Sequence, residues 1–271
     1  MVNETTPLLS AFIAHGRVPD CPIIDMHTHP DAFQGIYFPA PEMDGILRTM
    51  DRANVRQIAI APHTALFDPA YGNALTLRML DAHPDRFLGY LCYNPHYPDD
   101  LATLIPLLQQ PGILGFKIHP GGANYPLTGD GYRALFEVAE AEELIVLSHT
   151  WQSDTCGADQ CRRIAERYPN IYFLLGHSCC PDWAGAIALA RDFPRVYAEL
   201  TYAAHNIGMI DLAVKGGITD KLLFGTDLPW MDPFYTLGCI VFADITDDDR
   251  HAILHSNAER LLQQRFARLV G

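Results

Sequence analysis

The feature that most constrains the fold of this chain is an alternation of short apolar segments with longer segments of helical periodicity. Most of the apolar segments are rich in Ile, Val, Leu, Phe or Tyr, and many are apolar throughout. Uninterrupted apolar runs of this length are typical of parallel strands that are buried on both faces. The eight segments span residues 22–27, 56–62, 86–95, 112–120, 144–150, 171–178, 195–201 and 221–227.

The intervening segments have the pattern of helices. In residues 130–143, Tyr132, Leu135, Phe136 and Ala139 fall at positions i, i+3, i+4 and i+7, which form one stripe of a helix. Strands that alternate with helices predict parallel strands joined by right-handed crossovers. Eight such units predict an α/β fold of the (β/α)8, or TIM, barrel type. The alternative is a doubly wound open sheet, but the Gly-rich phosphate turn expected after its first strand is absent.

We expect residues 1–271 to form this barrel as a single domain. Residues 254–269 are predicted to be its last helix, and a short helix at about residues 6–16 is predicted to cover the barrel bottom.

Charge and composition exclude several classes of partner. The formal net charge is −13, so nucleic acid and anionic membrane surfaces are not expected to bind. No apolar run approaches the roughly 18 residues of a membrane span, and residues 1–10 lack the pattern of a signal peptide. The cysteine count is seven, an odd number at scattered spacing, which predicts reduced thiols. These features together predict a cytoplasmic protein.

Polar side chains occur where the first predicted strand ends. In "IIDMHTHP", residues 23–30, Asp25, His27 and His29 are spaced two apart, so they would share one face of a strand. Burying three polar groups in a row is costly unless they are hydrogen-bonded or bind an ion. We therefore interpret His27 and His29 as neighbouring metal ligands, and Asp25, one step deeper, as a hydrogen-bonding support.

The other strand ends carry the same kinds of residue. In a (β/α)8 barrel these ends meet at one rim, where the chemistry takes place. Nitrogen and oxygen donors without thiolates suit zinc, manganese or iron. The residues concerned are His63, Lys117, His119, His149, His177, Glu199 and Asp227.

These motifs resemble the amidohydrolase superfamily. The resemblance rests on D-x-H-x-H in the first strand, single histidines that end the fifth and sixth strands, and an aspartate that ends the eighth. "GFKIHP" (115–120) and "FGTDLPW" (224–230) narrow it to the amidohydrolase-related group of metal-dependent hydrolases. That group includes lactonases and the decarboxylases of aminocarboxymuconate semialdehyde and resorcylate.

The resemblance implies a mononuclear metal site of His27, His29, His149 and Asp227, with His177 beside the ion as a polarising or acid/base residue. Lys117 ends the fourth strand, where members with two metals carry a carboxylated lysine. Lys117 and His119 are therefore candidates for a second metal or a substrate anchor, and Lys117 could instead pair with Asp25 or Glu199. We favour one divalent ion, zinc first and manganese or iron next.

The resulting functional prediction is a metal-dependent hydrolase that uses an activated water on an ester, lactone or amide, with Asp227 and His177 as catalytic residues. The alternative is a metal-dependent non-oxidative decarboxylase of an aromatic or unsaturated acid, and a third class is a non-catalytic metal-binding barrel. The aromatic residues that follow the strands favour a small, ring-containing substrate. The chain could form a homo-oligomer. The predicted pocket residues are Trp151, Trp230, Tyr125 and Phe33.

Overall fold

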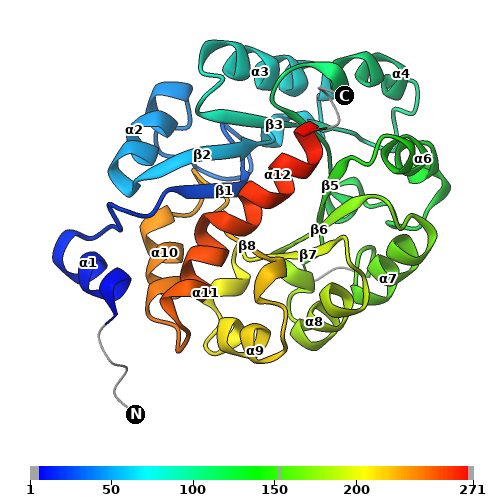
Figure 1. Cartoon of the computed structure of the whole chain (residues 1–271). Coiled ribbons are helices and arrows are strands. Elements are labelled where there is room, and N and C mark those ends of the chain that lie inside the picture. The colour runs from blue at the N-terminus through cyan, green and yellow to red at the C-terminus, as the bar shows by residue number, and fades with distance from the viewer. Residues whose placement is uncertain (1–5, 152–153, 268–271) are drawn as a thin grey trace.

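The computed structural model, which describes residues 6–151 and 154–267, contains a single eight-stranded parallel sheet in the order β1 to β8 (Figure 1). This confirms the TIM barrel. The strands are β1 (Ile23–Thr28), β2 (Val55–Ile60), β3 (Phe87–Cys92), β4 (Ile113–Ile118), β5 (Ile145–His149), β6 (Tyr172–Gly176), β7 (Val196–Glu199) and β8 (Leu222–Leu223).

Helices on the outside of the barrel alternate with the strands, as the periodicity predicts. The α-helices are α1 (Pro7–His15), α2 (Met43–Ala53), α3 (Pro69–Ala82), α4 (Asp100–Leu104), α5 (Pro120–Ala123), α6 (Arg133–Ala141), α7 (Ala158–Arg167), α8 (Trp183–Asp192), α9 (Met209–Lys215), α10 (Pro233–Val241), α11 (Asp247–His251) and α12 (Asn257–Ala267). Shorter turns are η1 (His63–Leu66), η2 (Ile105–Gln109), η3 (Asp130–Tyr132), η4 (His177–Cys179), η5 (Ala203–His205), η6 (Thr219–Lys221) and the π-helical η7 (Ala252–Ser256).

The seam between β8 and β1 is closed by backbone hydrogen bonds that continue beyond β8. The Met26 N–H donates to the Phe224 carbonyl at 2.9 Å, and the His29 N–H donates to the Leu228 carbonyl at 2.7 Å. The expected strand over 221–227 was too long, because the chain leaves the regular ladder after Leu223 and Asp227 adopts a left-handed φ of 62°. This irregular backbone places Asp227 directly against β1.

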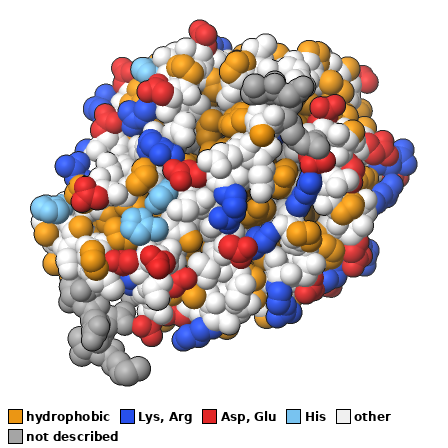
Figure 2. All heavy atoms as spheres, in the orientation of Figure 1, with side chains coloured by type: hydrophobic (Ala, Val, Ile, Leu, Met, Phe, Trp, Pro, Cys, Tyr) orange, Lys and Arg blue, Asp and Glu red, His pale blue; other side chains and the backbone are white. Residues whose placement is uncertain are grey.

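The N-terminal end of the barrel is covered by α12, which crosses the front of the barrel in Figure 1. Leu261 and Leu262 join the apolar cluster that fills the barrel interior together with Ile24 and Leu114. The Arg265 Nε–H donates to the Leu114 carbonyl at 3.0 Å, which fixes the helix to the start of β4. On this face, acidic and basic side chains are interspersed with apolar ones (Figure 2).

The prediction that the N-terminal helix covers the barrel bottom was wrong. Helix α1 lies at the side of the barrel against α10, where the rings of Phe12 and Phe242 meet edge to face at 6.2 Å. The Leu8 N–H also donates to the Asp247 carboxylate at 3.1 Å. The bottom is occupied instead by the apolar stripe of α12. No disulfide joins any of the seven cysteines, all of which the structure describes. No helix among the described residues is long and apolar enough to span a membrane.

Candidate metal centre

The two histidines of β1 are held in one tautomer by their hydrogen-bond partners. The His27 Nδ1–H donates to the Glu199 carboxylate at 2.7 Å, and the His29 Nδ1–H donates to the Ala61 carbonyl at 2.6 Å. A carbonyl only accepts, so Nδ1 of His29 carries the hydrogen and its Nε2 keeps a lone pair. Nδ1 of His27 carries the hydrogen in the same way when Glu199 is ionised, the state that a cation bound beside His27 would favour. Partners of this kind orient metal-binding histidines.

Asp227 brings a third donor atom to the same point. Its Oδ1 lies 3.2 Å from Nε2 of His29 and 3.5 Å from Nε2 of His27, and these donor atoms all lie within 4.8 Å of one another. Oδ1 is buried and accepts no hydrogen bond from the described residues. Acceptor atoms that face each other at such distances repel unless a cation lies among them. Tetrahedral ligands bonded at about 2.0–2.2 Å lie about 3.3–3.6 Å apart, which fits the observed spacing.

Lys117 contacts this cluster through His27. Its Nζ lies 2.7 Å from Nε2 of His27, and the side chain is buried. Burial lowers the pKa of Lys117 to about 8. Among the described residues no ion pair joins Lys117 to Asp25 or Glu199, so the expected alternative of such a pair finds no support in the geometry.

Two buried carboxyl groups support β1 from below. Asp25 accepts from the backbone N–H of His27 at 3.0 Å and from the Thr226 hydroxyl at 2.5 Å, which confirms its predicted hydrogen-bonding role. Glu199 accepts from His27 through Oε2, and its Oε1 accepts from the Thr201 N–H at 2.6 Å. Burial raises the pKa of Asp25 to about 7 and that of Glu199 to about 8.

A glycine of "FGTD" makes room for the Glu199 carboxylate. A Cβ at Gly225 would lie 2.0 Å from Glu199 Oε1 and 2.6 Å from the Thr201 hydroxyl, closer than any real contact allows. The sequence analysis did not predict that Glu199 accepts a hydrogen bond from His27. The available signal was a carboxylate at the end of the seventh strand.

His177 and His149 lie beside the cluster. The rings of His177 and His27 are 5.0 Å apart, and those of His149 and His177 are 4.6 Å apart. His177 Nδ1 lies 3.3 Å from the Thr201 carbonyl, which again leaves Nε2 free. The donor atom of His149 falls outside the close group formed by His27, His29 and Asp227, so its role as fourth ligand stays a prediction.

His119 makes different contacts from His27 and His29. Its ring stacks on His149 at 3.8 Å, and its Nδ1 accepts from the Gly122 N–H at 2.8 Å, capping α5. The remaining hydrogen is therefore on Nε2, which leaves no free lone pair for a metal. In the structure His119 therefore caps α5, and its assignment as a ligand of a second metal stays a prediction.

His63, which the sequence places at a strand end but to which we assigned no role in the site, lies against the cluster. His63, in η1, stacks on His29 with ring centroids 3.8 Å apart, and its buried Nδ1 has no partner among the described residues. Phe33, a predicted pocket residue, lies 5.2 Å from His63. The sequence signal for His63 was its place at the end of the second strand.

The other predicted pocket residues differ in their distance from the cluster. Trp151 lies 5.5 Å from the His177 ring, and it stacks on Tyr202 at 4.0 Å. Trp230 is 42% exposed, and its backbone N–H donates to the Asp227 carbonyl. The Tyr125 hydroxyl accepts from the Gly131 N–H, which turns this residue toward its own loop. Their assignment to a substrate pocket stays a prediction.

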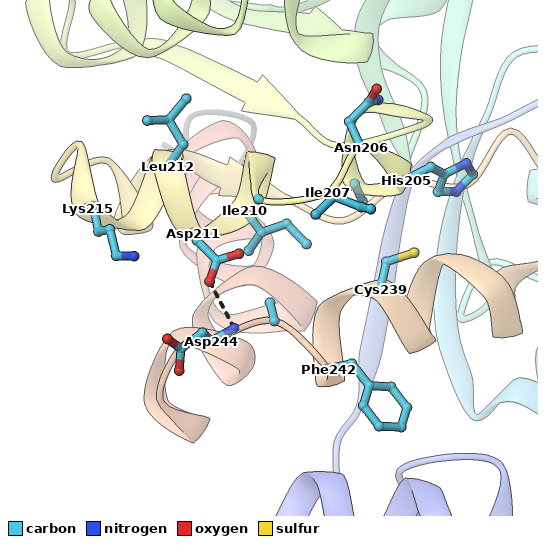
Figure 3. A pocket seen from close by; sticks show the side chains of 13 residues that line it. His205, Asn206, Ile207, Ile210, Asp211, Leu212, Lys215, Cys239, Phe242 and Asp244 are labelled. Atoms are coloured by element: carbon cyan, nitrogen blue, oxygen red, sulfur yellow. Dashed lines mark hydrogen bonds between the residues drawn. The ribbon is translucent and has the colours of Figure 1, made fainter. Parts of the chain in front are cut away.

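A separate groove of about 640 Å³ lies on the outside of the barrel between α9 and α10 (Figure 3). Ile207, Leu212 and Phe242 line it, and the Asp244 N–H donates to Asp211 across it at 3.0 Å. His27, His29 and Asp227 do not line this groove, so the groove is separate from the candidate metal centre.

Burial lowers the pKa of His29 to about 3, of His63 to about 2 and of His177 to about 4. Below the unfolded pKa of about 6.5 these imidazoles are neutral when folded and protonated when unfolded, so acid destabilises the fold. Asp25 and Glu199 have raised pKa values in the folded protein. Between the unfolded and the folded pKa they are protonated when folded and ionised when unfolded, so they lower the stability of the fold as the pH rises.

Between pH 7 and pH 5 we therefore expect the free energy of unfolding of the metal-free wild type to fall by about 2 kcal/mol more than that of the metal-free His63→Gln variant. Urea unfolding of both proteins, prepared with a chelator, measures the difference. Equal losses in the two proteins would show that His63 is protonated in the folded state.

Comparisons with known proteins identify the class to which this barrel and its centre belong. The sequence model described as "Amidohydrolase" matches residues 24–264, and the chain belongs to the amidohydrolase family. This confirms the resemblance seen in the motifs. No curated protein matches the chain.

Similar solved structures share the fold at low sequence identity. An uncharacterized TIM-barrel protein from Bordetella bronchiseptica is 19% identical, with a TM-score of 0.75 over 92% of this chain and 99% of that one. The 2,6-dihydroxybenzoate decarboxylase from Rhizobium is 15% identical, with a TM-score of 0.73 over 90% and 99%. The 5-carboxyvanillate decarboxylase from Novosphingobium aromaticivorans, complexed with manganese and a nitrobenzoic acid, is 12% identical, with a TM-score of 0.69 over 90% and 97%.

Proposed function

We propose that this chain is a metal-dependent hydrolase that cleaves an ester, lactone or amide bond of a small, ring-containing molecule. The observation that carries the proposal is the convergence of three lone-pair donors, Nε2 of His27, Nε2 of His29 and Oδ1 of Asp227, at the C-terminal end of the barrel. Family membership supports the same class of chemistry.

His27, His29 and Asp227 would hold one divalent ion, with His149 as the fourth ligand. Two imidazoles and a carboxylate suit zinc first, and manganese or iron next. Such an ion lowers the pKa of a bound water toward neutrality. The buried, otherwise unpartnered Oδ1 of Asp227 is the feature of the chain that best fits a cation.

The chain's own residues would supply the proton transfers. Asp227 would hold the ion through Oδ1, and its second carboxylate oxygen would accept a proton from the attacking water. His177 has Nε2 free beside the cluster, where it can stabilise the developing oxyanion or protonate the leaving group. Phe33 and Trp151 offer apolar faces for a ring.

The proposal is tested by removing and restoring the ion. The purified protein is screened against aryl esters, lactones and anilides, then treated with a chelator and reconstituted with Zn²⁺ or Mn²⁺. We expect hydrolysis to disappear with the ion and to return with it. Hydrolysis that persists in the fully metal-free protein would overturn the proposal.

A non-oxidative decarboxylase is the second candidate. Two of the structurally similar proteins are decarboxylases of aromatic acids, and one of these is complexed with manganese. The aromatic side chains beside the cluster of this chain would accept such a ring. Lys117 is the described cation that contacts the cluster, and it would have to balance the substrate carboxylate. Release of CO2 from hydroxybenzoates without ester hydrolysis would select this candidate.

Trp151 provides a test of the predicted pocket. Its ring lies near His177 but makes no hydrogen bond to the cluster through Nε1, which is buried without a partner among the described residues. Trp151→Ala should therefore raise KM more than it lowers kcat, whereas Trp151→Phe should keep most of the binding. Steady-state kinetics on the best substrate separates the two constants. An unchanged KM in Trp151→Ala would mean that the ring only packs the loop.

A further inference from the structure

A second group of potential metal ligands lies at the opposite end of the barrel. Cys21 precedes β1 and is fully buried, His251 ends α11, and His255 belongs to the π-helical turn η7. Their ligand atoms all lie within 4.8 Å of one another. Histidine side chains reach the surface on the face that α12 crosses (Figure 2).

The distances within this group match the edges of a tetrahedral zinc site. Cys21 Sγ lies 3.6 Å from His251 Nδ1, and His251 Nδ1 lies 3.2 Å from His255 Nε2. Bonds of about 2.3 Å to sulfur and about 2.0–2.1 Å to nitrogen place tetrahedral ligands about 3.6 Å apart for sulfur and nitrogen, and about 3.3 Å apart for two nitrogens. Both observed distances fall at these values.

His255 has the hydrogen-bond support of a metal ligand. Its Nδ1 lies 3.3 Å from the Glu259 carboxylate and 3.3 Å from the Ser256 hydroxyl. When Nδ1–H donates to Glu259, Nε2 presents its lone pair to His251. A carboxylate behind the imidazole is the common arrangement at zinc-bound histidines. The π-helical turn that carries His255 is itself a rare element, and such turns occur frequently at functional sites.

Hydrogen bonding cannot pair all three atoms of this group at once. Cys21 Sγ and His255 Nε2 both approach the same atom, Nδ1 of His251, at 3.6 Å and 3.2 Å. Nδ1 either donates one hydrogen or accepts one along its single lone pair, so if His255 Nε2–H donates to it, the Cys21 thiol has no acceptor in the group. A dication binds all three atoms together, with loss of the thiol proton to solvent.

We propose that Cys21, His251 and His255 bind a second divalent ion, Zn²⁺, with a water molecule as the fourth ligand because both imidazoles are partly exposed. The ion would join the segment that enters β1 to the segment that follows β8. These segments lie at the two ends of the sequence, so the ion would stabilise the closure of the barrel. This site is independent of the proposed function, because it lies at the opposite end of the strands from His27 and His29.

The carboxylates around the group favour a cation and oppose a free thiolate. Without an ion, burial raises the pKa of the Cys21 thiol to about 12, and the charges of Glu259 and Asp247 add to this effect. The same two carboxylates would attract a dication to the site.

Cobalt substitution tests the proposal with a signal that the catalytic centre does not give. Protein stripped of metal and loaded with Co²⁺ should show a thiolate-to-cobalt charge-transfer band in the near ultraviolet. The band should disappear in Cys21→Ser and persist in Cys239→Ser, a control at a half-buried cysteine of α10. Zinc-loaded Cys21→Ser should contain one equivalent less than the wild type.

Absence of the band in the wild type, or the same band in Cys21→Ser, would overturn the site. If Cys21→Ser fails to fold, His255→Gln provides the second variant, because its side chain is partly exposed and its loss removes a ligand without opening the core. Unchanged zinc content in His255→Gln would equally overturn it. Since neither readout depends on turnover, failure of the hydrolase proposal would leave this test unaffected.

Discussion

Asp227→Asn is expected to retain the fold and to lower kcat by about 10²–10⁴-fold, the usual contribution of a general base. The amide cannot take a proton from the attacking water. The fold should persist because the backbone N–H of residue 227 still donates to the His27 carbonyl at 2.9 Å. Asn also tolerates the left-handed φ of 62° better than most residues.

The measurement is kcat on the best substrate, together with the metal content of each protein. Asp220→Asn is the matched control, because Asp220 is exposed and lies far from the cluster in η6. If Asp227→Asn binds no metal, kinetics at saturating Zn²⁺ separate the loss of a ligand from the loss of the base. Near-normal turnover in the metal-loaded variant would remove Asp227 from its catalytic role.

The barrel was predictable because its signal is local. Each apolar run predicts a strand by itself, and every strand begins within one residue of the expected start. The residue at which β8 ends, and the identity of the helix that covers the barrel bottom, were not predictable from local pattern. Both depend on which surfaces meet after closure, as when Leu261 and Leu262 of α12 bury themselves against the barrel interior.

The candidate centre was predictable as a set of residue types at strand ends, but its supporting contacts were not. His27, His29 and Asp227 converge as expected, although His27 obtains its tautomer from Glu199, 172 positions along the chain. No pattern within one strand reports such a contact. The stacking of His63 on His29 was missed for the same reason.

The two proposed metal sites change how the measured metal content of the protein must be interpreted. Two equivalents of zinc would match a carboxylated Lys117 in a binuclear centre, but they would also match one ion in each site. Because burial lowers the pKa of Lys117 to about 8, part of the amine is neutral at neutral pH, as carboxylation requires. Loss of one equivalent in Cys21→Ser assigns the second ion to the barrel bottom, whereas loss in Lys117→Met assigns it to the catalytic end.

Glu199→Gln is expected to weaken metal binding at the proposed site of His27, His29 and Asp227 by about 10–100-fold. Glu199 accepts hydrogen bonds from three donors: the His27 Nδ1–H, the His177 N–H and the Thr201 N–H. A glutamine has the same volume but only one accepting oxygen. At least one of these donors must then face an NH2 group or lose its partner.

His27 is the donor that can respond, by moving its hydrogen to Nε2, where the lone pair for the ion is needed. The expected result is therefore a higher dissociation constant for Zn²⁺, with kcat largely restored at saturating Zn²⁺. A metal-buffered titration measures it, and Glu142→Gln, a change at an exposed position after α6, is the control. Unchanged affinity would mean that Glu199 does not set the tautomer of His27. A loss of kcat that saturating metal cannot restore would place Glu199 in the chemistry itself instead of in the positioning of His27.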